Sequence, residues 1–222
     1  MIKKDFSWGN LHQSMVDTLK REFTDSNLYE TIYKVKEGDI VVDIGASTGI
    51  FTHIILPQKP KHVFCLEPSK TNFPFLVQNT LGYPVTSINK AIGKGNGFSD
   101  WNDGGIYADE GIYETITFNT FIKRFGIKKI DFLKTDCEGG EYDIFNDDNI
   151  DFLLNNVGCI VGEWHLGHYY EKPLFRNFRD KYLSRFKSIK VYSVDGIDIT
   201  WDLWNDHFIE YYQQVIFHIS NK

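Results

Sequence analysis

The segment Ile40-Val-Val-Asp-Ile-Gly-Ala-Ser-Thr-Gly49 decides the fold class of this chain. Its first half is a short, mainly apolar run of the kind found in strands buried inside a parallel sheet. Its second half is a glycine-containing turn, and the apolar residues 48–56 that overlap it predict a helix. A strand, a glycine turn and a helix in this order indicate the first unit of an α/β protein.

The same alternation continues along the chain. Further strands are predicted at residues 62–68, 84–92, 129–136 and 157–165, and helices at residues 70–80, 120–126, 140–145 and 175–186. Strands that alternate with helices predict a doubly wound sheet whose strands run parallel. Two late β-rich segments, residues 187–194 and 211–220, predict an antiparallel edge of that sheet.

The chain has no internal repeat and no linker-like tract, so we predict a single domain over residues 1–222. Residues 1–36 predict a helical lead-in, residues 38–165 the ligand-binding core, and residues 166–222 a substrate-side region with the edge strands. The polar, glycine-rich residues 93–114 predict a surface loop or short hairpin beside the site.

Composition and charge exclude some classes of protein. The chain has 24 Lys and Arg against 30 Asp and Glu, a formal net charge of -6, which argues against a nucleic-acid partner. No apolar run approaches the roughly 20 residues that span a bilayer, so we predict no membrane span and a cytoplasmic location. The sequence carries no signal for an oligomeric state.

Candidate ligand-binding residues follow the predicted strands, where open α/β sheets bind their ligands. The glycine turn from Gly45 to Gly49 follows the first strand, and Glu67 ends the second, roughly 20 residues further on, where a carboxylate can bind ribose hydroxyls. The turn lacks the G-x-G-x-x-G pattern that accommodates a pyrophosphate. An adenosine ligand without a pyrophosphate, such as S-adenosylmethionine, therefore fits better than a dinucleotide.

Three segments carry a resemblance to a known family: VVDIGASTGIFT (41–52), CLEPSKTNFPFLVQN (65–79) and KKIDFLKTDCEGGEYDIF (128–145). Through them, residues 38–165 resemble the FkbM family of methyltransferases. The resemblance implies a Rossmann-like methyltransferase fold with a mostly parallel seven-stranded sheet and S-adenosylmethionine as the cofactor. It also implies O-methylation, often of sugars or secondary metabolites.

The resemblance implies where the cofactor binds, including adenine packing near Ala91 and a site carboxylate at Asp136. The predicted cofactor-binding residues are Asp43, Gly45, Ala46, Ser47, Gly49, Glu67, Pro68, Ala91 and Asp136. The acceptor, a glycan or other small molecule, is expected to contact the divergent residues 93–114 and those after Leu166.

A catalytic group is predicted at the end of the fifth strand. Glu163 and His165 are two residues apart on this strand, so their side chains share a face, and Asp136 ends a strand expected to be its neighbour. A base beside an acceptor hydroxyl speeds its reaction by roughly 10²–10⁴-fold. We predict His165 as the general base, with Asp136 and Glu163 orienting it or the acceptor. No metal site is predicted, although these residues and His168 leave a divalent ion open as an alternative.

Two other functions remain open from the sequence. Residues 45–49 match G-x-S-x-G, and Ser47, Asp136 and His165 follow in the order of a serine hydrolase. No earlier strand supplies an oxyanion hole, and Glu67 would have no role. The second alternative is a non-catalytic module that binds S-adenosylmethionine, against which the polar residues at the strand ends argue.

Overall fold

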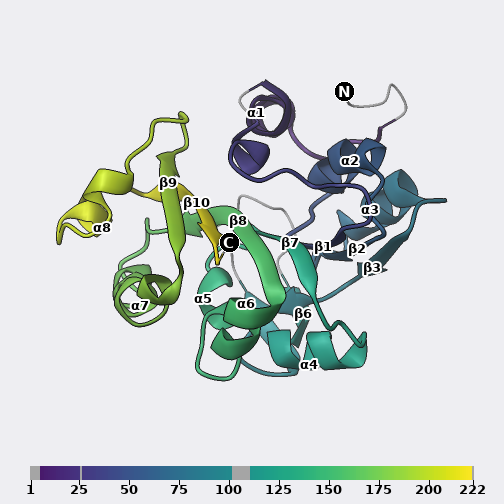
Figure 1. The fold of residues 1–222 in the computed structure, drawn as a ribbon. Helices are drawn as coiled ribbons and strands as arrows, with labels where there is room; N and C mark the ends of the chain where they lie inside the picture. Colours follow the sequence, from purple (N-terminus) through teal and green to yellow (C-terminus); the bar gives the residue numbers. More distant parts are fainter. Residues whose placement is uncertain (1–5, 26, 102–110, 222) are drawn as a thin grey trace.

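A seven-stranded sheet forms the centre of the computed structural model, which describes residues 6–25, 27–101 and 111–221 (Figure 1). In spatial order the strands are β3 (Val85–Ile88), β2 (His62–Leu66), β1 (Ile40–Ile44), β7 (Ile130–Thr135), β8 (Val157–His165), β10 (Gln214–Ser220) and β9 (Ser188–Ser193). Strands β3, β2, β1, β7 and β8 pair in parallel, and β10 runs antiparallel to both of its neighbours. The predicted parallel sheet with an antiparallel C-terminal edge is confirmed.

A second, three-stranded sheet corrects one predicted strand. Its strands are β4 (Ala91–Ile92), β6 (Gly111–Ile116) and β5 (Gly97–Trp101). The predicted strand 84–92 is divided between the two sheets because Asn89 turns the chain, donating hydrogen bonds to the carbonyls of Glu67 and Pro68 at 2.8 and 3.1 Å. The predicted hairpin at residues 93–114 is present as the antiparallel pair β5 and β6, while residues 102–110 of it lie outside the described residues.

Helices cover both faces of the large sheet (Figure 1). One face carries α1 (Gln13–Lys20), α2 (Ile50–Ile55) and α3 (Phe73–Thr80), and the other carries α4 (Phe118–Arg124), α5 (Glu141–Ile144), α6 (Ile150–Asn156) and α7 (Glu171–Asn177). Helix α8 (Phe208–Tyr211) precedes β10 at the far edge. Helix α6 was not predicted. The predicted helix 175–186 is confirmed as the end of α7, a π-helical turn (Phe178–Tyr182) and a 3-10 turn (Leu183–Arg185).

The N-terminal lead-in is less helical than predicted. After α1 it continues as a π-helical turn (Arg21–Asp25) and a 3-10 turn (Leu28–Glu30), and residues 31–39 carry no helix. Short 3-10 turns also follow α2 (Leu56–Gln58) and precede α8 (Thr200–Asp202). Among the described residues, no helix is both long enough and apolar enough to cross a membrane. The cytoplasmic location stays a prediction.

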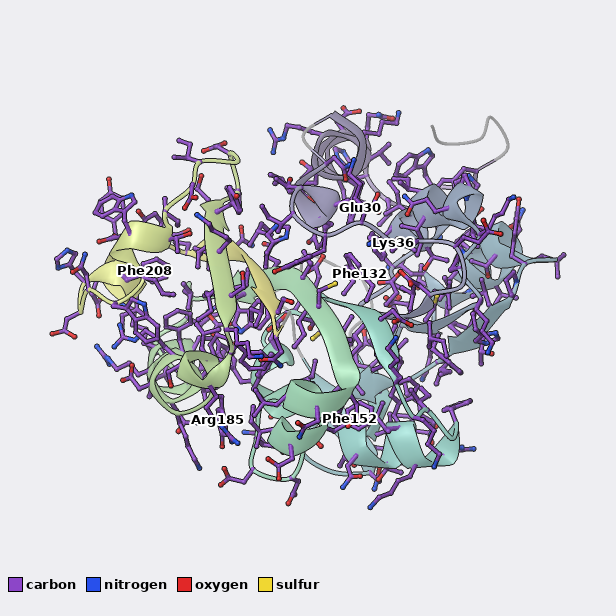
Figure 2. The ribbon with its side chains drawn as sticks, viewed as in Figure 1. Glu30, Lys36, Phe132, Phe152, Arg185 and Phe208 are labelled. Carbon is purple, nitrogen blue, oxygen red and sulfur yellow. The ribbon has the colours of Figure 1, made fainter. Side chains whose placement is uncertain are left out.

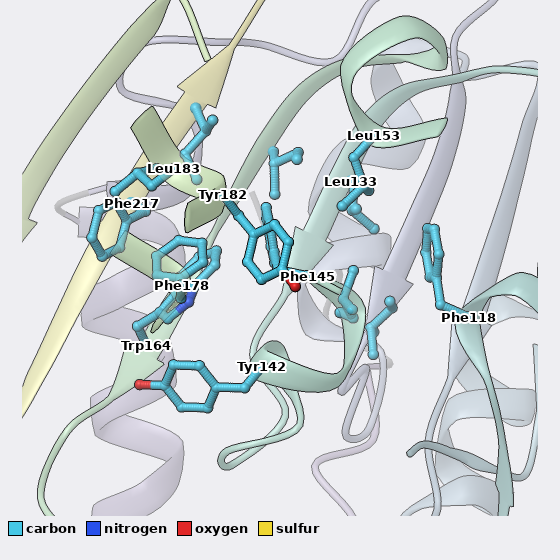
Figure 3. Close-up of a cluster of buried hydrophobic side chains, with 14 of the residues drawn as sticks. Phe118, Leu133, Tyr142, Phe145, Leu153, Trp164, Phe178, Tyr182, Leu183 and Phe217 are labelled. Carbon is cyan, nitrogen blue, oxygen red and sulfur yellow. The ribbon is translucent and has the colours of Figure 1, made fainter. Parts of the chain in front are cut away.

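Alternating strand residues supply two hydrophobic clusters, one on each face of the sheet. In β7, Phe132 belongs to the cluster beneath α1–α3, and the next residue, Leu133, belongs to the opposite cluster (Figures 2 and 3). In β8, Trp164 is fully buried in the second cluster and stacks on Phe178 with ring centroids 5.1 Å apart (Figure 3). Neighbouring strand residues point to opposite faces of a sheet. Because Trp164 is buried in the cluster opposite α1–α3, the side chains on either side of it point toward the face that carries α1–α3.

Candidate active site

A cavity of about 560 Å³ opens where β1, β2 and β7 end. Its volume lies within the roughly 300–1,000 Å³ typical of sites for small ligands and cofactors. The predicted residues that line it are Gly45, Ala46, Ser47, Glu67, Pro68, Ala91 and Asp136. Residues predicted from separate strand ends therefore meet around one cavity.

The glycine turn brings the end of β1 against the end of β7. Gly45 has a φ of 74°, and a Cβ atom there would lie 1.7 Å from the backbone oxygen of Asp136, so no other residue fits. Gly49 is not part of the cavity lining. A Cβ at Gly49 would lie 2.8 Å from the side chain of Leu76, so this glycine allows α2 to approach α3. The structure thus gives Gly49 a packing role, and its predicted cofactor contact stays a prediction.

Glu67 presents a buried carboxylate at the cavity. Its two oxygens accept hydrogen bonds from the backbone N–H groups of Ser47 at 2.7 Å and Ser69 at 2.8 Å. Burial raises the pKa of Glu67 to about 7 and outweighs these hydrogen bonds, which favour the charged form. Glu67 thus fixes the glycine turn while its carboxylate lines the space for a ligand.

Asp43 is not among the residues that line the cavity, and its predicted cofactor contact stays a prediction. Its side chain is fully buried behind the glycine turn, where Oδ2 accepts a hydrogen bond from Thr52 Oγ1 at 2.7 Å. Its other oxygen lies 3.3 Å from Lys134 Nζ. Asp43 therefore stabilises the glycine turn through Thr52 and Lys134.

Lys134 is a buried cation that the sequence analysis did not single out. Its Nζ donates to the Gly45 carbonyl at 2.7 Å and lies 3.6 Å from Asp136 Oδ2. Burial disfavours the charged ammonium, but the carboxylates of Asp43 and Asp136 outweigh that effect and raise the pKa of Lys134. A lysine within a mainly apolar strand was the available signal, because such a residue is rarely buried without a partner.

The N-terminal segment also takes part in the site. The Tyr29 hydroxyl donates a hydrogen bond to Asp136 Oδ2 at 3.1 Å, and Leu19 and Phe23 line the cavity. Phe23 stacks on Tyr29 with ring centroids 4.6 Å apart. The segment predicted only as a lead-in thus covers the cavity and orients a site carboxylate.

His165 lies among three carboxylates. Its Nε2 is 3.2 Å from Glu138 Oε2 and 3.6 Å from Glu163 Oε1, while Nδ1 is 3.5 Å from Glu141 Oε1. Burial alone would lower the pKa of the imidazole, but the carboxylates, Glu141 first, raise it well above its ordinary value. These carboxylates therefore favour the protonated ring, which is unfavourable for the predicted role of general base.

Glu141 holds this arrangement in place. Its side chain is fully buried, and its oxygens accept hydrogen bonds from the backbone N–H groups of Cys137 at 2.7 Å and Gly139 at 2.8 Å. His168 does not join the cluster, because it is exposed and stacks on Tyr170 with ring centroids 5.2 Å apart. The predicted neighbours Asp136, Glu163 and His165 are brought together, with Glu138 and Glu141 added by the turn after β7.

Comparison with known proteins agrees with this geometry. The sequence matches the Methyltransferase FkbM domain over residues 15–188, well over half of the chain. The chain belongs to the FkbM methyltransferase family. Membership confirms the resemblance noted in the sequence, and with it methyl transfer and S-adenosylmethionine as the methyl donor of the family. A search of curated proteins finds no match.

Solved structures confirm the Rossmann-like methyltransferase fold of this FkbM methyltransferase. A candidate rRNA methylase from Clostridium thermocellum is 12% identical, with 93% of this chain and 94% of that chain covered and a TM-score of 0.51. Fibrillarin from Aeropyrum pernix, solved with natively bound S-adenosyl-L-methionine, is also 12% identical, with 90% and 75% covered and a TM-score of 0.51. At this identity the likeness concerns the fold alone.

The FkbM methyltransferase does not assemble a serine hydrolase triad. The Ser47 hydroxyl is buried and makes no hydrogen bond with the described residues. The His165 ring faces Glu138, Glu141 and Glu163 instead, and the Asp136 carboxylate contacts Tyr29 and Lys134. The G-x-S-x-G match at residues 45–49 is thus a feature of the glycine turn.

Proposed function

We propose that this FkbM methyltransferase binds S-adenosylmethionine in the cavity and methylates a hydroxyl oxygen of a sugar, a glycan or another small hydroxylated acceptor. One observation carries the proposal: a single cavity joins the glycine turn and Glu67 to Asp136 and Glu138. When bound, S-adenosylmethionine supplies an electrophilic methyl group on a sulfonium sulfur. The chain itself has to bind the donor, orient the acceptor and hold the acceptor proton.

The cavity lining fits this donor. The Glu67 carboxylate is suited to accept hydrogen bonds from both ribose hydroxyls, and the apolar Ala91 and Ile92 suit the face of an adenine ring. Ser47 adds a buried hydroxyl that has no hydrogen-bond partner among the described residues. The donor also carries a positive sulfonium and an ammonium group, which the carboxylate of Asp136 would favour.

The acceptor is assigned to the Asp136 side of the cavity. Asp136 keeps 22% of its side chain exposed there, while Tyr29 and Lys134 fix one of its oxygens. In this position it accepts a hydrogen bond from the acceptor hydroxyl and aligns the oxygen with the methyl group, and such alignment accounts for up to about 7–11 kcal/mol in favourable cases. We assign His165 to positioning Glu138 and Glu163 instead of accepting the proton.

Aromatic side chains support a sugar-like acceptor. Tyr170 is half exposed and lines the cavity, as does Phe98, which is largely exposed. Rings in such positions can stack on the apolar face of a sugar while polar groups bind its hydroxyls. The net charge of -6 favours a glycan or small-molecule acceptor over a nucleic acid.

Calorimetric titration with S-adenosylmethionine and S-adenosylhomocysteine tests the donor site. Micromolar affinity is expected, with a clear loss in Glu67→Ala, and NAD serves as the control ligand. No binding of either compound by the folded protein would overturn the proposal.

A transfer assay with radiolabelled methyl donor tests the acceptor. Sugars, hydroxylated metabolites and a short RNA are compared, and the methylated atom of the product is identified by NMR. Methylation of a sugar or metabolite oxygen supports the proposal. Methylation of RNA alone, or donor binding without transfer to any compound of the panel, contradicts it, and the second result would favour the non-catalytic module.

A further inference from the structure

Three side chains with metal-binding atoms converge where β7 and β8 end. They are Asp136 after β7, Glu138 in the following turn and His165 at the end of β8, and one ligand atom from each lies within 4.8 Å of the others. Opposite ligands of a Mg²⁺ ion are about 4.2 Å apart, twice the bond length of about 2.1 Å. Small side-chain movements would therefore bring all three atoms into the first coordination sphere of one ion.

Glu163 independently indicates that a cation belongs beside these ligands. It is only 8% exposed, and its Oε1 lies 3.6 Å from His165 Nε2 and thus faces the cluster. Within the described part of the chain, no N–H or O–H group donates a hydrogen bond to this carboxylate. A buried carboxylate without a donor needs a cation beside it, and a divalent ion bound to His165 would take the place of the ring proton in that role.

The surroundings of the imidazole match those of a metal ligand. A histidine that binds a metal usually directs its second ring nitrogen at a carboxylate, which fixes the ring orientation. Here Nδ1 of His165 faces the fully buried Glu141, itself held by two backbone N–H groups, and Nε2 lies 3.2 Å from Glu138 Oε2. The ring thus directs one nitrogen at a second carboxylate of the cluster.

We propose that Asp136, Glu138 and His165 bind a divalent cation of the Mn²⁺ or Mg²⁺ type, with Glu163 beside it. Carboxylates are the ligands that both ions favour, and a single imidazole is compatible with Mn²⁺. Coordination displaces the ring proton of His165. The cation leaves positions for two neighbouring acceptor oxygens, as in a vicinal diol, and lowers the pKa of the coordinated hydroxyl, whose proton passes to water. This inference rests on the proposed O-methylation and specifies the acceptor as a chelating pair of oxygens.

Titration with Mn²⁺, followed by the EPR signal of the free ion, tests the site without an activity assay. One Mn²⁺ per chain is expected, displaced by excess Mg²⁺. Glu138→Gln and His165→Ala should weaken binding at least about tenfold, and Glu141→Gln about 10–100-fold through the orientation of the ring. Asp151→Asn, which removes an exposed carboxylate, is the matched control and should bind like the wild type.

Thermal unfolding of each variant confirms that it is folded, and Glu138→Gln is the variant with least structural risk because its side chain is one-third exposed. Absence of bound Mn²⁺ and Mg²⁺ at millimolar concentration, or equal binding by all variants, would overturn the inference. The same samples are titrated with S-adenosylhomocysteine. If the protein binds S-adenosylhomocysteine but neither Mn²⁺ nor Mg²⁺, the cation site is refuted and the donor site is not. If the folded protein binds the cation but not S-adenosylhomocysteine, the proposed donor site is refuted.

Discussion

Glu67 is expected to make donor binding dependent on pH. Its carboxylate form accepts the ribose hydroxyls, and burial raises its pKa to about 7, so the competent form is lost as the pH falls through 7. The dissociation constant of S-adenosylhomocysteine should be about tenfold larger at pH 6 than at pH 8. Isothermal titration calorimetry at both pH values measures this dissociation constant. Glu67→Gln should bind weakly with a much flatter pH profile, and an equally steep profile in that variant would assign the effect elsewhere.

Lys134 is expected to be essential for stability because its ammonium, on β7, contacts the buried carboxylate of Asp43 on β1 and the carbonyl of Gly45 that follows it. Lys134→Met leaves the carboxylate of Asp43 without its cation, which typically costs about 3–5 kcal/mol of unfolding free energy. Urea denaturation followed by tryptophan fluorescence measures the loss. Lys129→Met removes an exposed partner of Asp131 and should cost less than about 1 kcal/mol.

The double variant Lys134→Met with Asp43→Asn provides a further control. Removing the buried negative charge together with the cation should restore part of the lost stability, because no uncompensated charge then remains at position 43. If Lys134→Met were no more destabilising than Lys129→Met, the supporting role of the buried ammonium would be refuted.

The contact between β7 and β8 depends on a glycine. Gly162 pairs with Thr135, and a Cβ atom at Gly162 would lie 1.9 Å from the Thr135 backbone oxygen. Gly162→Ala should therefore separate the two strands that carry Asp136 and His165, lowering the unfolding free energy by about 3 kcal/mol and weakening Mn²⁺ binding. Gly167→Ala is the matched control, since its nearest contact would be an ordinary 4.0 Å. Equal stability of the two variants would contradict this reading of the strand contact.

The two hydrophobic clusters share one sheet, so the whole chain is expected to unfold in a single transition. S-adenosylhomocysteine at 100 times its dissociation constant should add about 2.7 kcal/mol of stability. For a chain of this length that corresponds to a rise in Tm of about 5–11 °C. Differential scanning calorimetry measures the number of transitions and the rise in Tm. Glu67→Ala at the same ligand concentration should show a smaller rise, and two separate transitions would contradict the predicted single domain.

Much of this molecule could be predicted because the signals are local in sequence. Apolar runs bounded by turns predicted every strand of the large sheet, and the glycine turn and Glu67 follow strands directly, so their position at the sheet edge could be inferred. The division of residues 84–92 between two sheets was missed because it depends on Asn89 bonding to the end of another strand. Helix α6, only seven residues long, was missed as well.

The sequence by itself determined the family, the strands of the large sheet in chain order, the methyl donor and seven of the residues that line its cavity. Only the tertiary structure decided the environments of Asp43, Lys134 and His165, because charges from different strands set them. It also placed Tyr29 on Asp136, a contact between residues 107 positions apart. Burial and ionisation depend on which groups meet in space, whereas strand and turn patterns depend on neighbours along the chain.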